Sequence, residues 1–300
     1  MRLGVMFDVA RPFNDVVAQV AQLHDAGIEA AWSSQIFGYD ALTLLAVIGR
    51  EVPDIHLGTA VVPTYPRHPV VLAAQALTVQ AATGGRLTLG IGLSHQMVIE
   101  TVFGLSYERP ARHMREYLEI LVPLLEGEQS AYAGETLRST TFGPLEVRAP
   151  APPVLVAALG TVMLGLAGRL ASGTVTWMTG PSTVEGHIVP TIRAAAAAAG
   201  RPEPQIAVGL PVCVTSDLAA ARERADATFG YYGNLPSYRE MLDREGAAGP
   251  VDVVIAGTAS EVTAQIRRLA DIGATDFVAA PFGTPEEIRA TVDTVAAVSA

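Results

Sequence analysis

The chain has 300 residues, of which 50% are hydrophobic, and it carries a formal net charge of −10 at pH 7. This acidity argues against a nucleic-acid partner, whose phosphates would need clustered Lys and Arg side chains. The single cysteine Cys213 excludes an internal disulfide, and no Cys/His cluster has zinc-ligand spacing. Neither a signal peptide nor a membrane-spanning stretch is visible. We therefore expect a cytoplasmic protein without bound metal or membrane partner.

Short apolar runs alternate with longer amphipathic segments along the chain. The apolar runs, predicted as strands buried on both faces, are 3–7, 29–34, 56–63, 86–92, 153–159, 173–178, 205–215 and 276–282. The amphipathic segments, predicted as helices, are 14–27, 40–52, 68–83, 111–127, 162–171, 182–200, 260–273 and 285–298. Asn14 and Asp40 are predicted to cap the first two helices, and Gly84 and Gly85 to end the third.

Three segments interrupt this alternation. Residues 93–107 form a long loop, 128–150 are turn-rich and predict a lid or a small hairpin, and 217–246 are predicted as an extra helical hairpin. Eight strands that are each followed by a helix are what a (β/α)₈ TIM barrel requires. We therefore predict one α/β barrel domain over residues 1–300, with insertions after the fourth and seventh strands. A doubly wound open sheet is disfavoured, because no glycine-rich turn follows the first strand.

Functional side chains of such a barrel gather just after each strand. Here these positions are mostly small and neutral, without the carboxylates of a metal or glycosidase site, which favours an organic cofactor with its own reactivity. Gly160 and Gly180, next to Thr161 and Thr179, either bind a phosphate through backbone N–H groups or simply permit the strand-to-helix turn. His95 follows the fourth strand and is either a proton donor or acceptor or an ordinary loop residue.

Two charged groups also have alternative interpretations. Arg67 and His68 precede the third helix, where they either contact an anion or start the helix. Arg109 and Arg112 start the fourth helix, where a structural role ranks before an anion site. Trp32 lies inside the second predicted strand, and we expect it in the core rather than on a cofactor.

Residues 57–95, LGTAVVPTYPRHPVVLAAQALTVQAATGGRLTLGIGLSH, strongly resemble the signature stretch of the luciferase-like monooxygenase superfamily. They are similar in particular to actinobacterial oxidoreductases that use the deazaflavin coenzyme F420. Further similar segments are AAWSSQIFGYD, YERPARHMREYLEIL, PVLVAALGTVMLGLAGRLASGTV and GATDFVAAPFG. The resemblance therefore covers nearly the whole chain.

The resemblance implies an often dimeric barrel with a deazaflavin or flavin over the strand ends. It also implies a bulge or a non-prolyl cis peptide bond at the end of the third strand, beneath the ring system, and that peptide would be Ala60–Val61. The residues that it assigns to the cofactor are Ser34, Gln35, Thr59, Ala60 and Val61 along the ring, Gly92, Ser94 and His95 from the fourth strand, and Ala158, Leu159, Gly160, Thr161, Thr179 and Gly180 around the phosphate.

One departure from the superfamily bears on the substrate. Its sugar-phosphate dehydrogenases have a His where this chain has Gln35, a Glu where His95 stands, and a Lys near residues 180–182. A sugar-phosphate substrate is therefore disfavoured, and proton transfer falls to His95 as the predicted catalytic residue.

The function implied is hydride transfer between F420 and a small organic substrate, such as an activated C=C, an imine, or a carbonyl or alcohol. An FMN-dependent monooxygenase is the alternative, because the same barrel accepts either ring. A non-catalytic ligand-binding barrel is a third hypothesis. We expect a homodimer.

Overall fold

The computed structural model describes residues 1–299. In this part of the chain, eight parallel strands close into a barrel in the order β12, β1, β2, β3, β5, β8, β9 and β10, with β10 pairing back onto β12. Their bounds are β1 (Arg2–Met6), β2 (Ala30–Ser33), β3 (His56–Thr59), β5 (Leu87–Gly92), β8 (Val154–Val156), β9 (Gly173–Trp177), β10 (Gln205–Val214) and β12 (Asp276–Pro281). The predicted (β/α)₈ fold is confirmed.

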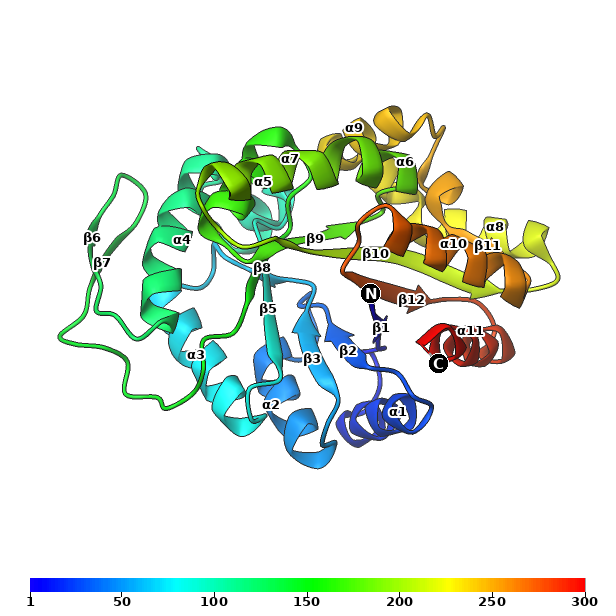
Figure 1. Ribbon diagram of the computed structural model, residues 1–300, viewed down its shortest axis with the longest axis horizontal. Helices are drawn as coiled ribbons and strands as arrows, with labels where there is room; N and C mark the ends of the chain where they lie inside the picture. The colour runs from blue at the N-terminus through cyan, green and yellow to red at the C-terminus, as the bar shows by residue number, and fades with distance from the viewer. Residues whose placement is uncertain (300) are drawn as a thin grey trace.

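Helices surround the barrel on its outer side (Figure 1). They are α1 (Phe13–Asp25), α2 (Ala41–Glu51), α3 (Pro69–Ala82), α4 (Pro110–Leu125), α5 (Thr161–Leu170), α6 (Pro181–Thr183), α7 (Val189–Ala198), α10 (Ala259–Asp271) and α11 (Pro285–Ser299). A π-helix, η2 (Val184–Ile188), joins α6 to α7. None of the helices in residues 1–299 is long and apolar enough to cross a membrane.

The predicted helix caps are confirmed at one helix and wrong at another. Asp40 caps α2, and its carboxylate accepts a hydrogen bond from the Thr43 backbone N–H at 2.9 Å. Asn14 lies inside α1 instead of capping it, because the N-cap is Pro12, two residues earlier than predicted. The carbonyl of Pro12 accepts the first helical hydrogen bonds, and the proline ring already restricts φ to a value that suits helix entry.

Two short strands also differ from the prediction. The predicted strand 56–63 is divided into β3 and β4 (Val62–Pro63), and β4 pairs with β5. Strand β11 (Ile255–Gly257) was not predicted, and it pairs with the end of β10 outside the ring. Three residues are too few for a hydrophobic period to show in the sequence.

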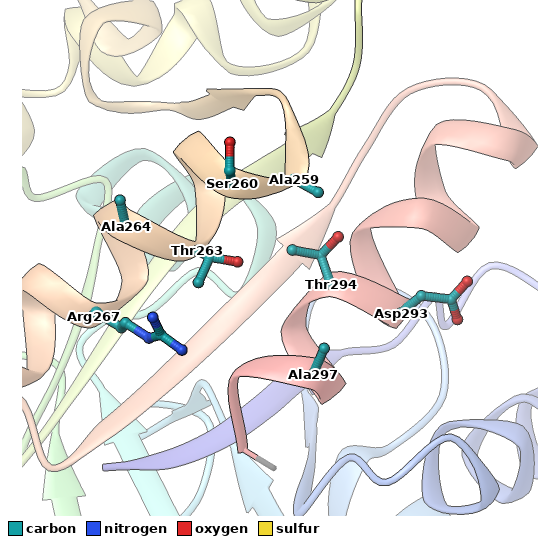
Figure 2. Close-up of a pocket in the computed structure, with 8 residues that line it drawn as sticks. All are labelled: Ala259, Ser260, Thr263, Ala264, Arg267, Asp293, Thr294 and Ala297. Carbon is teal, nitrogen blue, oxygen red and sulfur yellow. The ribbon is translucent and has the colours of Figure 1, made fainter.

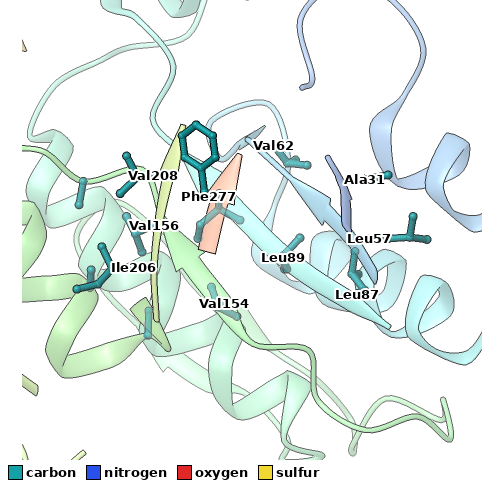
Figure 3. Close-up of a cluster of buried hydrophobic side chains, with 14 of the residues drawn as sticks. Ala31, Leu57, Val62, Leu87, Leu89, Val154, Val156, Ile206, Val208 and Phe277 are labelled. Atoms are coloured by element: carbon teal, nitrogen blue, oxygen red, sulfur yellow. The ribbon is translucent and has the colours of Figure 1, made fainter. Parts of the chain in front are cut away.

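The core has an outer and an inner layer. The outer layer lies between the strands and the helices, and Figure 3 shows its side chains, among them Leu57, Leu89, Val156 and Val208. The inner layer fills the barrel and contains Trp32 with Ala30, Leu155, Val175, Ala207 and Val278. Strand residues therefore alternate between the two layers, as the two-residue period of a strand requires.

Trp32 occupies the barrel interior and is only 1% exposed, as expected for a core residue. Two strand glycines make room for its indole ring. A Cβ on Gly4 would lie 2.6 Å from the indole Nε1, and one on Gly58 would lie 2.3 Å from Cε3. Both distances are shorter than any normal contact, so this ring is accommodated only by the absence of two neighbouring side chains.

The turn-rich segment 128–150 contains the hairpin β6 (Ala131–Ala133) and β7 (Arg138–Thr140), which lies beside α4 (Figure 1). Glu116 of α4 is buried, and its carboxylate accepts backbone N–H bonds from Glu135 at 3.0 Å, Thr136 at 2.8 Å and Leu137 at 2.9 Å. Burial alone would raise the pKa of Glu116, but the hydrogen bonds from Thr136 and its neighbours outweigh it and lower that pKa to about 2. The hairpin turn is thus folded around a buried charge.

The charged groups at the starts of α3 and α4 have structural partners. Arg109 and Arg112 both form ion pairs with Glu135 in the hairpin turn. Arg67 pairs with Asp40, which connects the starts of α3 and α2. The arginines therefore anchor loops and helices, in agreement with the structural interpretation.

The remaining insertions lie at the ends of β5 and β10. The 93–107 loop contains the π-helix η1 (Val98–Val102). The 217–246 segment folds into α8 (Leu218–Phe229), the 3₁₀ turn η3 (Gly230–Asn234) and α9 (Pro236–Glu245). Elsewhere, a shallow groove on the outer surface runs between α10 and α11, and its lining side chains are mostly small (Figure 2). That groove is outside the barrel, away from the strand ends.

Candidate active site

The floor of the barrel mouth, where the strands end, is formed by the break between β3 and β4. The Ala60–Val61 peptide bond is cis, as the resemblance implied. Both residues are half-buried and pack on the inner layer of the core. Gly92 at the end of β5 lies beside them, and a Cβ there would be 2.7 Å from Cγ2 of Val61. The floor is therefore apolar and closely packed.

Thr59 holds this floor in place from within the sheet. Its buried hydroxyl donates to the Gly90 carbonyl at 2.8 Å and accepts the Gly90 N–H at 2.8 Å. A Cβ on Gly90 would lie 1.9 Å from the Thr59 carbonyl oxygen, so only glycine fits opposite it. Because its only proton is donated to Gly90, the Thr59 hydroxyl supports the floor and cannot also donate to a ligand.

Ser34 and Gln35 follow β2 at the edge of the mouth, and both are half-buried. The Gln35 side-chain oxygen accepts the Ala41 N–H at 2.8 Å and so helps to cap α2. Its amide nitrogen is the group that remains to donate to a ligand.

His95 lies just beyond the end of β5, and its neighbour Ser94 has a left-handed backbone with φ of 60°. The Ser94 carbonyl accepts a hydrogen bond from the Tyr107 hydroxyl at 3.4 Å, which connects the two ends of the 93–107 loop. Burial lowers the pKa of His95 below its usual value of 6.5. At neutral pH the side chain is thus an uncharged imidazole that can accept a proton.

An aromatic cluster from the 217–246 segment faces this histidine. The ring of Tyr238 lies 6.2 Å from that of His95, and Tyr232 lies 4.9 Å from Tyr238. Trp177, the last residue of β9, lies 6.1 Å from Tyr232. The sequence analysis assigned no role to these rings. A signal existed, because three of the eight tyrosines fall within residues 231–238.

The two glycine turns predicted to bind a phosphate differ in the structure. Gly160 precedes α5, and no atom lies within 4 Å of a Cβ placed on it. Thr161 and Val162, the first residues of that helix, are exposed. Leu159 and Ala158 are less available to a ligand. The Leu159 carbonyl accepts a hydrogen bond from a histidine of η2 at 2.8 Å, and Ala158 is fully buried. The start of α5 is open.

The start of α6 is already occupied by a carboxylate of the same chain. Glu245 of α9 accepts the backbone N–H of Ser182 at 3.1 Å and that of Thr183 at 2.7 Å. A Cβ on Gly180 would lie 2.3 Å from the Glu245 carboxyl carbon. Thr179 is fully buried, and its hydroxyl donates to the carbonyl two residues earlier. In this conformation the α6 turn therefore offers neither of those two N–H groups to a phosphate.

In the described part of the chain, several buried donors at or just after the strand ends have no hydrogen-bond partner. They are the Trp177 indole N–H and the hydroxyls of Tyr65, Ser33 and Thr176. Tyr65 follows β4 and stacks on His113 with 4.0 Å between ring centroids. His113 is itself placed by a 3.1 Å hydrogen bond with Thr64, and burial lowers its pKa to about 4. A ligand with acceptor atoms would satisfy such donors.

The family model described as luciferase-like monooxygenase matches residues 1–300. The chain belongs to the luciferase-like monooxygenase family. This luciferase-like chain is 25% identical to 5,10-methylenetetrahydromethanopterin reductase from Methanolobus tindarius, over 96% of each chain.

Solved structures show the same fold. One is the coenzyme F420-dependent tetrahydromethanopterin reductase from Methanopyrus kandleri, with a TM-score of 0.83, 23% identity and coverage of 98% of this chain and 97% of that one. Another is the oxygenating constituent of 3,6-diketocamphane monooxygenase from Pseudomonas putida in complex with FMN, with a TM-score of 0.76, 17% identity and coverage of 99% and 96%. The luciferase-like barrel therefore occurs in proteins that use either type of cofactor.

Proposed function

We propose that this luciferase-like chain is an oxidoreductase that binds coenzyme F420 at the barrel mouth and catalyses hydride transfer to or from a small organic substrate. The observation that carries the proposal is the apolar floor at the cis Ala60–Val61 bond, together with the open start of α5. The extended ring of the cofactor needs an apolar floor, and its phosphate needs the open start of α5. The chain is also 29% identical over 192 residues to a putative coenzyme F420-dependent oxidoreductase of Mycobacterium tuberculosis, which supports F420 rather than FMN.

The residues present suit such a cofactor. Ala60 and Val61 would support the ring from below, and the backbone N–H groups after Gly160 would bind the phosphate. The unpaired Trp177 N–H and Tyr65 hydroxyl would meet acceptor atoms of the cofactor or substrate. Ala60 and Val61 are apolar and pack on the apolar inner layer of the core, which suits the face of an extended ring.

When bound, F420 supplies a ring carbon that accepts or donates hydride. The chain contributes position, exclusion of water and a proton acceptor. The lowered pKa of His95 keeps its imidazole uncharged at neutral pH, so a ring nitrogen can take the hydroxyl proton of an alcohol. In the direction of reduction the same nitrogen returns the proton. The aromatic rings of Tyr232 and Tyr238 shield this region from water.

Cofactor titration tests the assignment. The purified chain is titrated with F420 and, separately, with FMN, while the fluorescence of each cofactor is followed. We expect saturable binding of F420 and weaker binding of FMN. Tight FMN binding without any response to F420 would overturn the proposal and favour the FMN-dependent monooxygenase, whose cofactor the Pseudomonas relative holds.

His95→Gln tests the proton transfer. General acid–base catalysis is worth about 10²–10⁴-fold, so we expect kcat to fall in that range, and by more than the affinity for F420, to which the resemblance also assigns His95. A variant that turns over at the wild-type rate would remove His95 from the mechanism. We further propose a homodimer, by analogy with the family, and light scattering on the purified chain tests it.

A further inference from the structure

We infer that α9 makes the substrate site selective for uncharged, planar conjugated molecules, with Tyr238 as the contact surface and Glu245 as the group that excludes anions. This inference rests on the proposed function, because it names the substrate class of the same site. Three observations carry it: the aromatic cluster, the position of the Glu245 carboxylate, and the absence of an available cation on the 217–246 segment.

The aromatic cluster presents ring faces and edges next to the proposed proton acceptor. Tyr238 is 6.2 Å from His95, and Tyr232 packs edge-on against Tyr238 at 4.9 Å. Trp177 packs edge-on against Tyr232 at 6.1 Å. Burial raises the pKa of the Tyr238 hydroxyl, so this surface stays uncharged across the working pH range. Rings arranged in this way favour a planar apolar molecule.

Glu245 places a negative charge on the face of α9 that also carries Tyr238, two helical turns earlier. The carboxylate takes the backbone N–H groups of Ser182 and Thr183, at 3.1 Å and 2.7 Å. These groups carry the partial positive charge of a helix start, which attracts anions. Gly180 permits the approach, because a Cβ would meet the carboxyl carbon at 2.3 Å. An incoming carboxylate or phosphate would meet a like charge there instead of donors.

No cation of the 217–246 segment is available to compensate. All 20 basic residues of the chain are arginines, so no lysine can reach the site. The four arginines of α8 and α9 each have an acidic partner in the structure: Arg222 with Asp252, Arg224 with Glu287, Arg239 with Asp243 and Arg244 with Glu240. A negatively charged substrate beneath α9 would therefore find no unpaired arginine on α8 or α9. An unpaired charge is unfavourable in a buried position.

The test compares a neutral ligand with its anionic counterpart on the full-length chain, with and without F420. The probes are cyclohex-2-en-1-one and 4-oxocyclohex-2-ene-1-carboxylate. Binding is followed by tryptophan emission, because only two tryptophans are present and Trp32 is enclosed in the core, which leaves Trp177 as the local reporter. We expect the neutral enone to bind at least about fivefold more tightly. Any smaller preference in the wild-type chain overturns the inference.

Two matched variants assign the selectivity. Glu245→Gln keeps the side-chain size and removes the charge, whereas Glu223→Gln makes the same charge change on the exposed part of α8, where no arginine of residues 1–299 pairs with it. We expect Glu245→Gln to reduce the preference for the neutral enone to below about twofold and Glu223→Gln to leave it unchanged. An equal effect of both variants would show a general charge effect and would overturn the role of Glu245.

Tyr238→Leu tests the contact surface independently. We expect the affinity for the neutral enone to fall by about threefold or more, while F420 affinity is unchanged. Unchanged enone affinity would overturn the role of Tyr238. The cofactor assignment can fail independently of this inference. If the chain binds no F420 but still prefers the neutral enone, the proposed function is refuted and the inferred selectivity stands.

Discussion

Replacing Glu116 by Gln removes the buried charge around which the β6–β7 turn is folded. The side chain is 1% exposed and accepts four hydrogen bonds, three from backbone N–H groups and one from the Thr136 hydroxyl at 2.7 Å. A glutamine can accept some of these bonds, but its NH₂ group must face a donor. The variant therefore loses charge-assisted hydrogen bonds and leaves at least one buried N–H unpaired.

The size of the effect follows from the pKa of Glu116. A fall from 4.5 in the unfolded chain to about 2 in the folded one corresponds to about 3 kcal/mol of stabilisation at neutral pH. Because the folded pKa is the lower one, this stabilisation is complete above pH 4.5 and is lost as the pH falls through 4.5 towards 2. The free-energy difference between wild type and variant should shrink accordingly in acid.

Urea unfolding of both proteins at pH 7 and pH 3 measures this difference. Comparison at each pH cancels the titration of groups that Glu116 does not influence, such as His56. We expect a loss of about 3 kcal/mol at pH 7 that falls to less than half at pH 3. Glu126→Gln, an exposed change at the end of the same helix, serves as control and should have little effect at either pH. An equal loss at pH 7 and pH 3 would refute the depressed pKa.

Three further predictions concern other parts of the chain. Trp32→Ala should lower the unfolding free energy by about 3–5 kcal/mol through a cavity in the barrel, and a loss below about 1 kcal/mol in urea would contradict the interior packing. Gly180→Ala should push the Glu245 carboxylate away and speed limited proteolysis within residues 217–246, whereas Gly186→Ala, with no atom within 4 Å of the added carbon, should not. Burial lowers the pKa of His113 from 6.5 to about 4 in the folded chain. As the pH falls, the unfolded state therefore binds a proton at His113 before the folded state does, and the free energy of unfolding decreases as the pH falls from 6.5 to about 4. His113→Gln should flatten that part of the stability–pH curve, and an unchanged slope would contradict the assigned pKa.

The barrel was predictable because its signals are local. Each buried strand is an apolar run, and a short stretch such as Asp40 with Thr43 already contains a helix cap. The elements that were missed depend on distant partners. The division of the strand 56–63 depends on Gly90 of the neighbouring strand, and β11 is defined only by its pairing with β10.

The candidate site was predictable in its place but not in its detail. Because parallel strands of a barrel all end on the same face, their predicted ends place His95 and Gly160 on that face. The resemblance located the cis bond at Ala60–Val61. The sequence alone could not distinguish the two glycine turns. The difference lies in Glu245, which is more than 60 residues from the N–H groups that it contacts. The orientation of the Thr59 hydroxyl was equally hidden, because it depends on the partner strand.

The packing of Trp32 has a consequence for how this barrel can vary. The indole takes the volume that side chains at positions 4 and 58 would otherwise fill, so the three positions share a single space. A related chain that acquires a side chain at position 4 or 58 must carry a smaller residue at position 32 to keep the barrel intact. Substitutions at these positions should therefore be strongly non-additive, and the damage caused by Gly58→Ala should be largely repaired when Trp32 is also reduced in size.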